Sequence, residues 1–174
     1  MPDVPKKLKT INSTLKKHFP FSTICLWSSS FLNEFSIHQS IKTFFLIEVE
    51  KDSVESIFHF LKDRNYSVFI KPTQEVFKNY ALSENNFIIV KPIISEAPIQ
   101  TIKNLNTVTL EKMLVDVFCD EIIFAAYKGN EMKTIFTYAY NKYTINENKL
   151  LRYANRRGKK NQLKNYLELI NGNR

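Results

Sequence analysis

The chain has 174 residues, of which 44% are hydrophobic, 13% aromatic and 24% charged, and its formal net charge at pH 7 is +8. With only 3 glycines and this much apolar side chain, the composition excludes disordered, collagen-like and low-complexity proteins. No apolar run reaches the roughly 18 residues that a membrane-spanning helix needs, and no apolar segment follows the basic N-terminal residues as in a secretory signal. We therefore expect a cytoplasmic protein with no membrane partner.

Basic residues concentrate at the two ends of the chain. Residues 149–174 carry eight lysines and arginines against one glutamate, and residues 1–20 carry five lysines against one aspartate. The segment between them, 21–148, has 12 basic and 15 acidic residues. A concentrated basic stripe is typical of a surface that binds nucleic acid or an acidic protein. A solvated helix face that only keeps the protein soluble is an equal alternative.

The N-terminal half alternates between helical and strand patterns. Apolar residues at helical spacing predict a first helix over 4–18. A capping box of Asp52 and Glu55 predicts a helix between two strands, which we expect to be parallel in a strand–helix–strand unit. Residues 91–106 predict an irregular connection with a short strand near 99–102. The further expected elements are strands over 23–27, 43–50 (central, because both its faces are apolar), 66–70 and 87–90, and short helices over 31–35 and 73–80.

From residue 109 onward the pattern predicts helices, the third of which begins at a capping box of Thr144 and Glu147 and stops at Gly158. An apolar pattern also continues from Ile122 up to Gly129. The expected helices cover 110–117, 132–143, 144–157 and 163–170. We therefore predict an α/β (α+β) fold in a single domain: a small mixed sheet within an α/β part, 1–108, followed by a helical basic part, 109–174.

Sequence motifs for catalysis or cofactor binding are not found. The chain has no glycine-rich phosphate loop and no nucleophile elbow, and its three histidines and two cysteines stand at no metal-ligand spacing. We expect no enzymatic activity, no metal and no cofactor. One alternative is a metal-dependent nuclease, because Glu48 and Glu50 at the end of a strand loosely resemble carboxylates that hold Mg²⁺ beside a scissile phosphate. Lys51 departs from that pattern, since it directly follows Glu50 instead of standing one residue apart.

Three segments together resemble the C-terminal region of AbiEi-like antitoxins of bacterial type IV toxin–antitoxin systems. They read LWSSSFLNEFSIHQ at 26–39, VTLEKMLVDVF at 108–118 and LLRYANRRG at 150–158. The resemblance covers about residues 20–168. The chain departs from the family at Phe31, where a small residue is usual, and at its start, where Met1 stands about where the family's winged helix-turn-helix would end. The matched motif positions, for which we expect structural roles, are Trp27, Ser29, Leu32, Glu111, Leu114 and Asp116.

Two of these positions allow an expectation from the residues alone. Glu111 falls in the first turn of a predicted helix, where the helix dipole favours a carboxylate. Asp116 is expected to be a buried polar anchor between helices. Neither is expected to be a catalyst.

The resemblance implies an antitoxin that represses its own operon and opposes a nucleotidyltransferase toxin. On this basis we expect a non-enzymatic regulatory module of a toxin–antitoxin or phage-defence system. Its basic helices would contact nucleic acid, DNA in preference to RNA. Charge reversal at Arg156 and Arg157 would leave the fold intact, because Gly158 marks the end of a surface helix. A module that binds a neighbouring toxin or defence protein is the alternative beside the nuclease. The expected contact residues are Arg152, Arg156, Arg157, Lys159 and Lys160.

Overall fold

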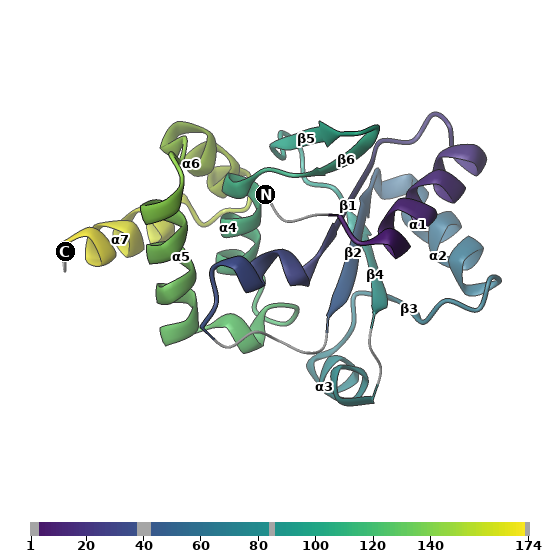
Figure 1. The fold of residues 1–174 in the computed structure, drawn as a ribbon, viewed down its shortest axis with the longest axis horizontal. Helices are drawn as coiled ribbons and strands as arrows, with labels where there is room; N and C mark the ends of the chain where they lie inside the picture. The colour runs from purple at the N-terminus through teal and green to yellow at the C-terminus, as the bar shows by residue number, and fades with distance from the viewer. Residues whose placement is uncertain (1–3, 38–42, 84–85, 173–174) are drawn as a thin grey trace. The chain divides into compact units, whose positions relative to one another are not determined.

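The structure is a computed structural model that describes residues 4–37, 43–83 and 86–172 (Figure 1). The chain separates into two compact units, one of residues 1–34, 40–93 and 100–107 and one of residues 35–39, 94–99 and 108–174. The predicted change from an α/β part to a helical part lies beside the last border between these units. Positions 38 and 39 of the first resemblance segment, and Arg174 of the basic stripe, fall outside the described residues.

A four-stranded mixed sheet organises the first unit. Its strand order is β1-β2-β4-β3, with β1 antiparallel to β2 and with β2 and β3 both parallel to β4. All six residues of β2 are buried, Glu48 among them, as expected for the central strand that the sequence predicted. The strand–helix–strand prediction is confirmed, although β4 lies between its two parallel strands. The strands are β1 (Ile24–Ser28), β2 (Phe44–Val49), β3 (Val68–Ile70) and β4 (Phe87–Pro92).

Helices precede and connect these strands, and α1 buries Leu8, Ile11 and Leu15 along one face. The predicted capping box at the start of α2 is wrong. A 3₁₀ turn, η2, runs directly into α2, and neither Glu50 nor Ser53 caps the turn or the helix through its side chain; the Ser53 amide donates to the Glu50 carbonyl instead. The elements are α1 (Lys6–His18), η1 (Ser29–Glu34), η2 (Lys51–Ser53), α2 (Val54–Lys62) and α3 (Gln74–Ser83).

A hairpin of β5 (Ile99–Ile102) and β6 (Leu105–Val108) occupies the connection that the sequence predicted to be mostly irregular. Its two loop residues, Lys103 and Asn104, both have positive φ, at 47° and 63°. A two-residue hairpin loop of this kind usually carries Asn-Gly or Asp-Gly. The sequence did not predict β6, because its loop lacks the glycine that usually marks such a turn.

The second unit contains α4 (Leu110–Cys119), η3 (Ala125–Tyr127), α5 (Asn130–Lys142), α6 (Glu147–Arg156) and α7 (Lys160–Asn171). The Thr109 hydroxyl caps α4 by accepting from the Lys112 amide at 3.3 Å. The predicted capping box of Thr144 and Glu147 is wrong, because Asn146 is the N-cap of α6 and accepts from the Lys149 amide at 3.0 Å. The predicted α/β class, with helices at the C-terminal end, is confirmed. In the described part of the chain no helix is both long and apolar enough to cross a membrane.

Candidate nucleic-acid interface

The two basic helices α6 and α7 are each apolar on one face and polar on the other. In α6, Leu150, Tyr153 and Ala154 are buried. In α7, Leu163, Leu167 and Ile170 are buried. This spacing buries one stripe of each helix and leaves the remaining positions, which are mostly charged or amide side chains, in solvent.

The link between α6 and α7 ends the first helix tightly. Gly158 has φ +68°, a left-handed conformation that glycine adopts without steric cost. Its amide donates to the Asn155 carbonyl, and the Lys159 amide donates to the Ala154 carbonyl. These two bonds form the Schellman arrangement that ends a helix, so the stop that the sequence predicted at Gly158 is confirmed.

The five predicted contact residues differ in their exposure. The side chains of Arg152 and Arg156 are 66% and 47% exposed, and Lys160 is also exposed, whereas Lys159 is half-buried. The Arg157 side chain is only 14% exposed. The structure therefore presents Arg152, Arg156 and Lys160 to solvent and turns Arg157 into the protein.

An acidic residue that sequence reasoning missed lies against the exposed arginines. Glu96, in the segment 94–99 of the same unit, forms an ion pair with Arg156 and a second with Arg152, whose Nε is 3.8 Å from Oε2 of Glu96. The residues are 56 and 60 positions apart, so no local pattern could reveal this pairing. Glu96 partly neutralises the surface that the two arginines form.

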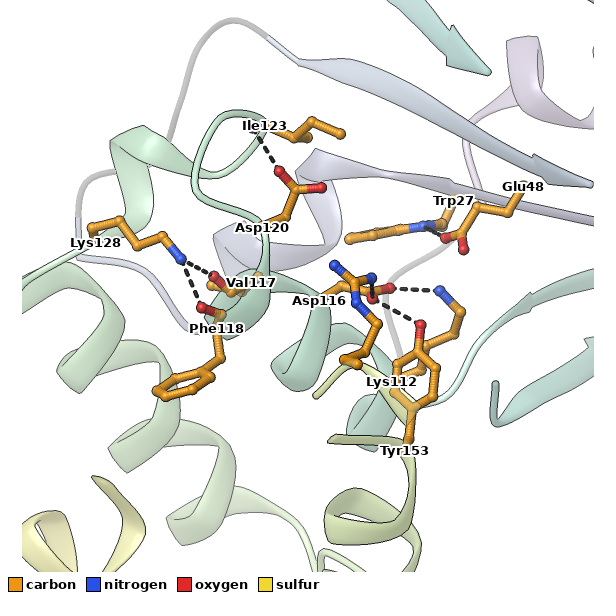
Figure 2. Close-up of polar contacts among 11 residues, drawn as sticks. Trp27, Glu48, Lys112, Asp116, Val117, Phe118, Asp120, Ile123, Lys128 and Tyr153 are labelled. Atoms are coloured by element: carbon orange, nitrogen blue, oxygen red, sulfur yellow. Dashed lines mark hydrogen bonds and ion pairs between the residues drawn. The ribbon is translucent and has the colours of Figure 1, made fainter. Parts of the chain in front are cut away.

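Arg157 belongs instead to a buried polar cluster around Asp116, which we call the Asp116 cluster. One carboxylate oxygen of Asp116 accepts from Arg157 Nη1 at 2.8 Å and from the Tyr153 hydroxyl at 2.9 Å, and the other accepts from Lys112 Nζ at 2.5 Å. Lys112 and Asp116 are both fully buried. Figure 2 shows the Lys112 and Tyr153 side chains directed at the Asp116 carboxylate.

The Asp116 cluster changes the interpretation of Arg157. Burial lowers the pKa of its guanidinium, but the Asp116 carboxylate outweighs burial and raises the pKa above the ordinary value. Arg157 is thus held as a cation between α6 and α4, and the prediction that its charge can be reversed without effect on the fold disagrees with this geometry. The expectation that Asp116 is a buried anchor agrees with it. The i, i+4 spacing of Lys112 and Asp116 on an apolar helix was the one signal that could have revealed the cluster.

The other motif residues of α4 are also built into the second unit. Leu114 is fully buried. A carboxylate oxygen of Glu111 accepts from the Asn146 amide at 3.2 Å, which ties the start of α4 to the start of α6. Burial opposes ionisation of Glu111, but hydrogen bonds to its carboxylate and the nearby Lys149 lower the pKa below its ordinary value.

Lys128 caps the C-terminal end of α4. Its ammonium donates to the carbonyls of Val117 and Phe118 at 2.7 and 2.9 Å (Figure 2). These carbonyls belong to the last turn of the helix, where a cation is favoured by the helix dipole. Burial lowers the pKa of Lys128, although Asp120 and Glu121 oppose this shift. No sequence pattern indicated this capping role, because Lys128 lies outside the helix that it caps.

The first resemblance segment contributes buried residues to the first unit. The Trp27 indole donates to Oε1 of Glu48 at 2.9 Å, and both side chains are fully buried (Figure 2). The Ser29 hydroxyl accepts from the Phe44 amide at 3.0 Å, which joins η1 to β2, and Leu32 is fully buried. These contacts give all three motif positions, Trp27, Ser29 and Leu32, structural roles.

The carboxylates of the nuclease alternative are engaged within the fold. Glu48 is buried against Trp27, and Glu50 accepts from the Thr23 amide at 2.7 Å. Burial opposes ionisation of Glu50, but its hydrogen bonds with Thr23 lower the pKa of the carboxyl. Among residues 4–37, 43–83 and 86–172, no group of three or more His, Cys, Asp or Glu side chains could hold a metal ion.

The fold and the exposed arginines define a mixed α/β protein with a basic helical end. A family model matches residues 1–173, and the chain belongs to that family, DUF6577, which is described as a family of unknown function. Comparison with curated proteins and with solved structures finds no match.

Proposed function

We propose that this chain is a non-enzymatic regulatory module that contacts nucleic acid, duplex DNA in preference to RNA, through α6 and α7. The observation that carries this proposal is the exposure of Arg152, Arg156 and Lys160 on two consecutive helices, where Lys164 adds a fourth exposed cation. Within the described part of α7 the only carboxylate is Glu168, so the beginning of this helix carries positive charge alone.

Such a surface suits a phosphate backbone. Lysine and arginine side chains that neutralise phosphates release counterions, so affinity falls steeply as salt concentration rises. These contacts supply affinity and position but carry no sequence information by themselves. The proposed contact set is therefore Arg152, Arg156, Lys160 and Lys164, with Lys159 at its edge, and it omits Arg157 because that side chain serves Asp116.

The resemblance to AbiEi-like antitoxins supplies the biological setting of the proposal. In that family the antitoxin represses its own operon and opposes a nucleotidyltransferase toxin. We propose the same setting here: a cytoplasmic antitoxin-like regulator of a type IV toxin–antitoxin or phage-defence system. Its motif residues maintain the fold, and a neighbouring nucleotidyltransferase is its functional partner.

The proposal is tested by measuring binding of the full chain to a generic 20-base-pair DNA duplex and to an RNA duplex of equal length across a salt series. Replacing Arg152, Arg156 and Lys160 by alanine should lower the DNA affinity and reduce the log–log salt slope by about 3, since each phosphate contact contributes about 0.9. The matched control replaces the exposed Lys17, Lys51 and Lys78 of the first unit, which removes the same charge elsewhere.

Four results bear on the proposal. A larger loss of DNA affinity in the α6–α7 variant than in the control supports it. Equal losses in both variants would mean that only net charge matters, and no binding at low salt would refute it. Tighter binding of the RNA duplex would overturn the preference for DNA.

One observation favours a second candidate, a module that binds an acidic segment of a toxin or defence protein. Glu96 already places a carboxylate between Arg152 and Arg156, which shows that these arginines can bind a carboxylate side chain. This candidate predicts that the product of a neighbouring toxin or defence gene binds the wild-type chain but not the Arg152→Ala/Arg156→Ala variant. Isothermal titration of the two purified proteins measures this directly.

A further inference from the structure

The connection between the basic helices α6 and α7 supports a more specific form of the proposed function. Helix α6 ends at Arg156 and helix α7 begins at Lys160, so only three residues join them, and the middle one is Gly158. Two helices joined by a three- or four-residue turn with glycine are the pattern of a helix-turn-helix, whose second helix enters the DNA major groove.

The turn and the helix that follows it are held in place by three sets of contacts. The Schellman bonds to the Ala154 and Asn155 carbonyls hold the backbone of the turn on α6. Arg157, the first residue of the turn, is anchored to Asp116 of α4 at 2.8 Å. Leu163 and Leu167 are buried on the inner face of α7. The direction in which α7 leaves α6 is thereby set by the fold, as a helix that reads DNA requires.

The outer face of α7 carries amide side chains beside its lysines. Asn161, Gln162 and Asn165 are all exposed and lie within the first six residues of the helix. Asn165 is three positions from Gln162 and four from Asn161, so each of these two side chains is a neighbour of Asn165 on the helix surface. Lys160 and Lys164, which are also exposed, lie beside them on the same helix.

This combination of side chains is chemically suited to the major groove. Asparagine and glutamine can form paired hydrogen bonds with N6 and N7 of adenine, whereas lysines neutralise the adjacent phosphates. In helix-turn-helix proteins the N-terminal residues of the second helix contact base edges while the first helix crosses the backbone. Arg152 and Arg156 on α6 are available for that backbone contact once Glu96 releases them.

Resting on the function proposed above, we propose that α6 and α7 form a helix-turn-helix in which α7 is the recognition helix and reads bases through Asn161, Gln162 and Asn165. The ligand is duplex DNA of defined sequence, with adenine among the contacted bases. The lysines and arginines supply general affinity, and the three amides supply the sequence preference.

The experiment selects bound sequences from a pool of duplexes with a random 20-base-pair centre, using the full chain. The enriched duplex and a shuffled duplex of the same composition are then titrated with wild type, with Asn161→Ala/Gln162→Ala/Asn165→Ala, and with a control triple, Gln74→Ala/Asn130→Ala/Asn141→Ala, which removes three exposed amides outside α6 and α7. Thermal unfolding of each variant verifies that the fold is kept.

We expect enrichment of an adenine-containing sequence that wild type prefers over the shuffled duplex. The α7 triple variant should lose about tenfold or more in affinity for the enriched duplex per lost base contact, while its affinity for the shuffled duplex and its salt slope stay unchanged. Enrichment that the α7 variant retains, or binding to DNA without any enriched sequence, would overturn the recognition-helix proposal and leave the proposed function standing. No binding to any duplex at low salt would refute both.

Discussion

Asp116 accepts a hydrogen bond from Arg157 at 2.8 Å, and this bond joins two residues that are 41 positions apart. Because of this bond, the adjacent Arg156 and Arg157 have different roles. Arg156 extends into solvent and pairs with Glu96, whereas Arg157 turns inward to a carboxylate that is fully buried. The pairing also ties the turn before α7 to α4, so that the direction of α7 depends on a buried charge.

We expect Arg157→Ala to lower the free energy of unfolding by about 3 kcal/mol, because it removes one partner from a buried ionic cluster. The loss should lie at the lower end of the range for buried pairs, since Lys112 and Tyr153 continue to bind Asp116. Chemical denaturation followed by circular dichroism measures this difference. Arg156→Ala is the matched control and should cost less than about 0.5 kcal/mol, as an exposed ion pair contributes little. Equal losses in the two variants would show that the Asp116 cluster does not depend on Arg157.

Much of the fold was predictable because its signals are local. The run of apolar residues in β2 predicted a central strand, and all six of its residues are buried between β1 and β4. Gly158 predicted the end of α6, because left-handed backbone at that position suits glycine. The strand β6 was missed because its turn uses Lys103 and Asn104 at positive φ, without the glycine that usually marks such a turn.

The candidate site was less predictable, because exposure is decided by distant residues. In the sequence, Arg156 and Arg157 are equivalent neighbours, and only the position of Asp116 on α4 distinguishes them. Glu96 lies in a segment with no recognisable pattern, so its pairing with two arginines of α6 could not be anticipated. The exposed amides of α7 went unnoticed because the basic residues beside them dominate the charge of the segment.

The free energy of unfolding at low pH should depend on Glu111. The pKa of this carboxyl is lower in the folded chain than its ordinary value of 4.5, because its hydrogen bonds and Lys149 outweigh burial. As pH falls, the unfolded chain therefore takes up this proton first. The stabilisation from Glu111 is complete above about pH 4.5 and is lost as pH falls through the folded-state pKa.

Glu111→Gln should reduce stability by about 1 kcal/mol at pH 7, as expected for losing a charged hydrogen-bond acceptor. Below pH 4.5 the difference from wild type should shrink. Urea denaturation at pH 7, 5, 4 and 3 measures it, with Glu147→Gln, an exposed residue of the first turn of α6, as the control. A Glu111→Gln difference that is constant over this pH range would contradict the assigned pKa direction.

Glu48 should act as a structural acceptor in the first unit. Glu48→Ala leaves the buried Trp27 indole without the acceptor at 2.9 Å, and it should cost about 2 kcal/mol or more. Glu48→Gln keeps an oxygen near the indole and should cost less. Both are measured by thermal unfolding, with Trp27 fluorescence as the local signal.

A comparison of wild type with Glu48→Gln distinguishes this role from the nuclease alternative. If Glu48 is structural, neither wild type nor Glu48→Gln should cleave DNA or RNA when Mg²⁺ is added. Mg²⁺-dependent cleavage by wild type that disappears in a folded Glu48→Gln variant would instead establish the metal-dependent nuclease.

Glu96 should weaken DNA binding by occupying the arginines that contact phosphate. Its carboxylate pairs with Arg156 and with Arg152, so a phosphate must displace it from both. Glu96→Gln removes this competition, and we expect several-fold tighter binding of a generic duplex at low salt and a steeper salt dependence. The control, Glu147→Gln, removes an equal charge from the exposed start of α6 and should change the affinity less, because no arginine is released. In the Arg152→Ala/Arg156→Ala background, Glu96→Gln should have no more effect than the control. A gain in DNA affinity that persists in that background would mean that Glu96 acts through net charge alone. Arg152 and Arg156 would then not be the residues that contact phosphate.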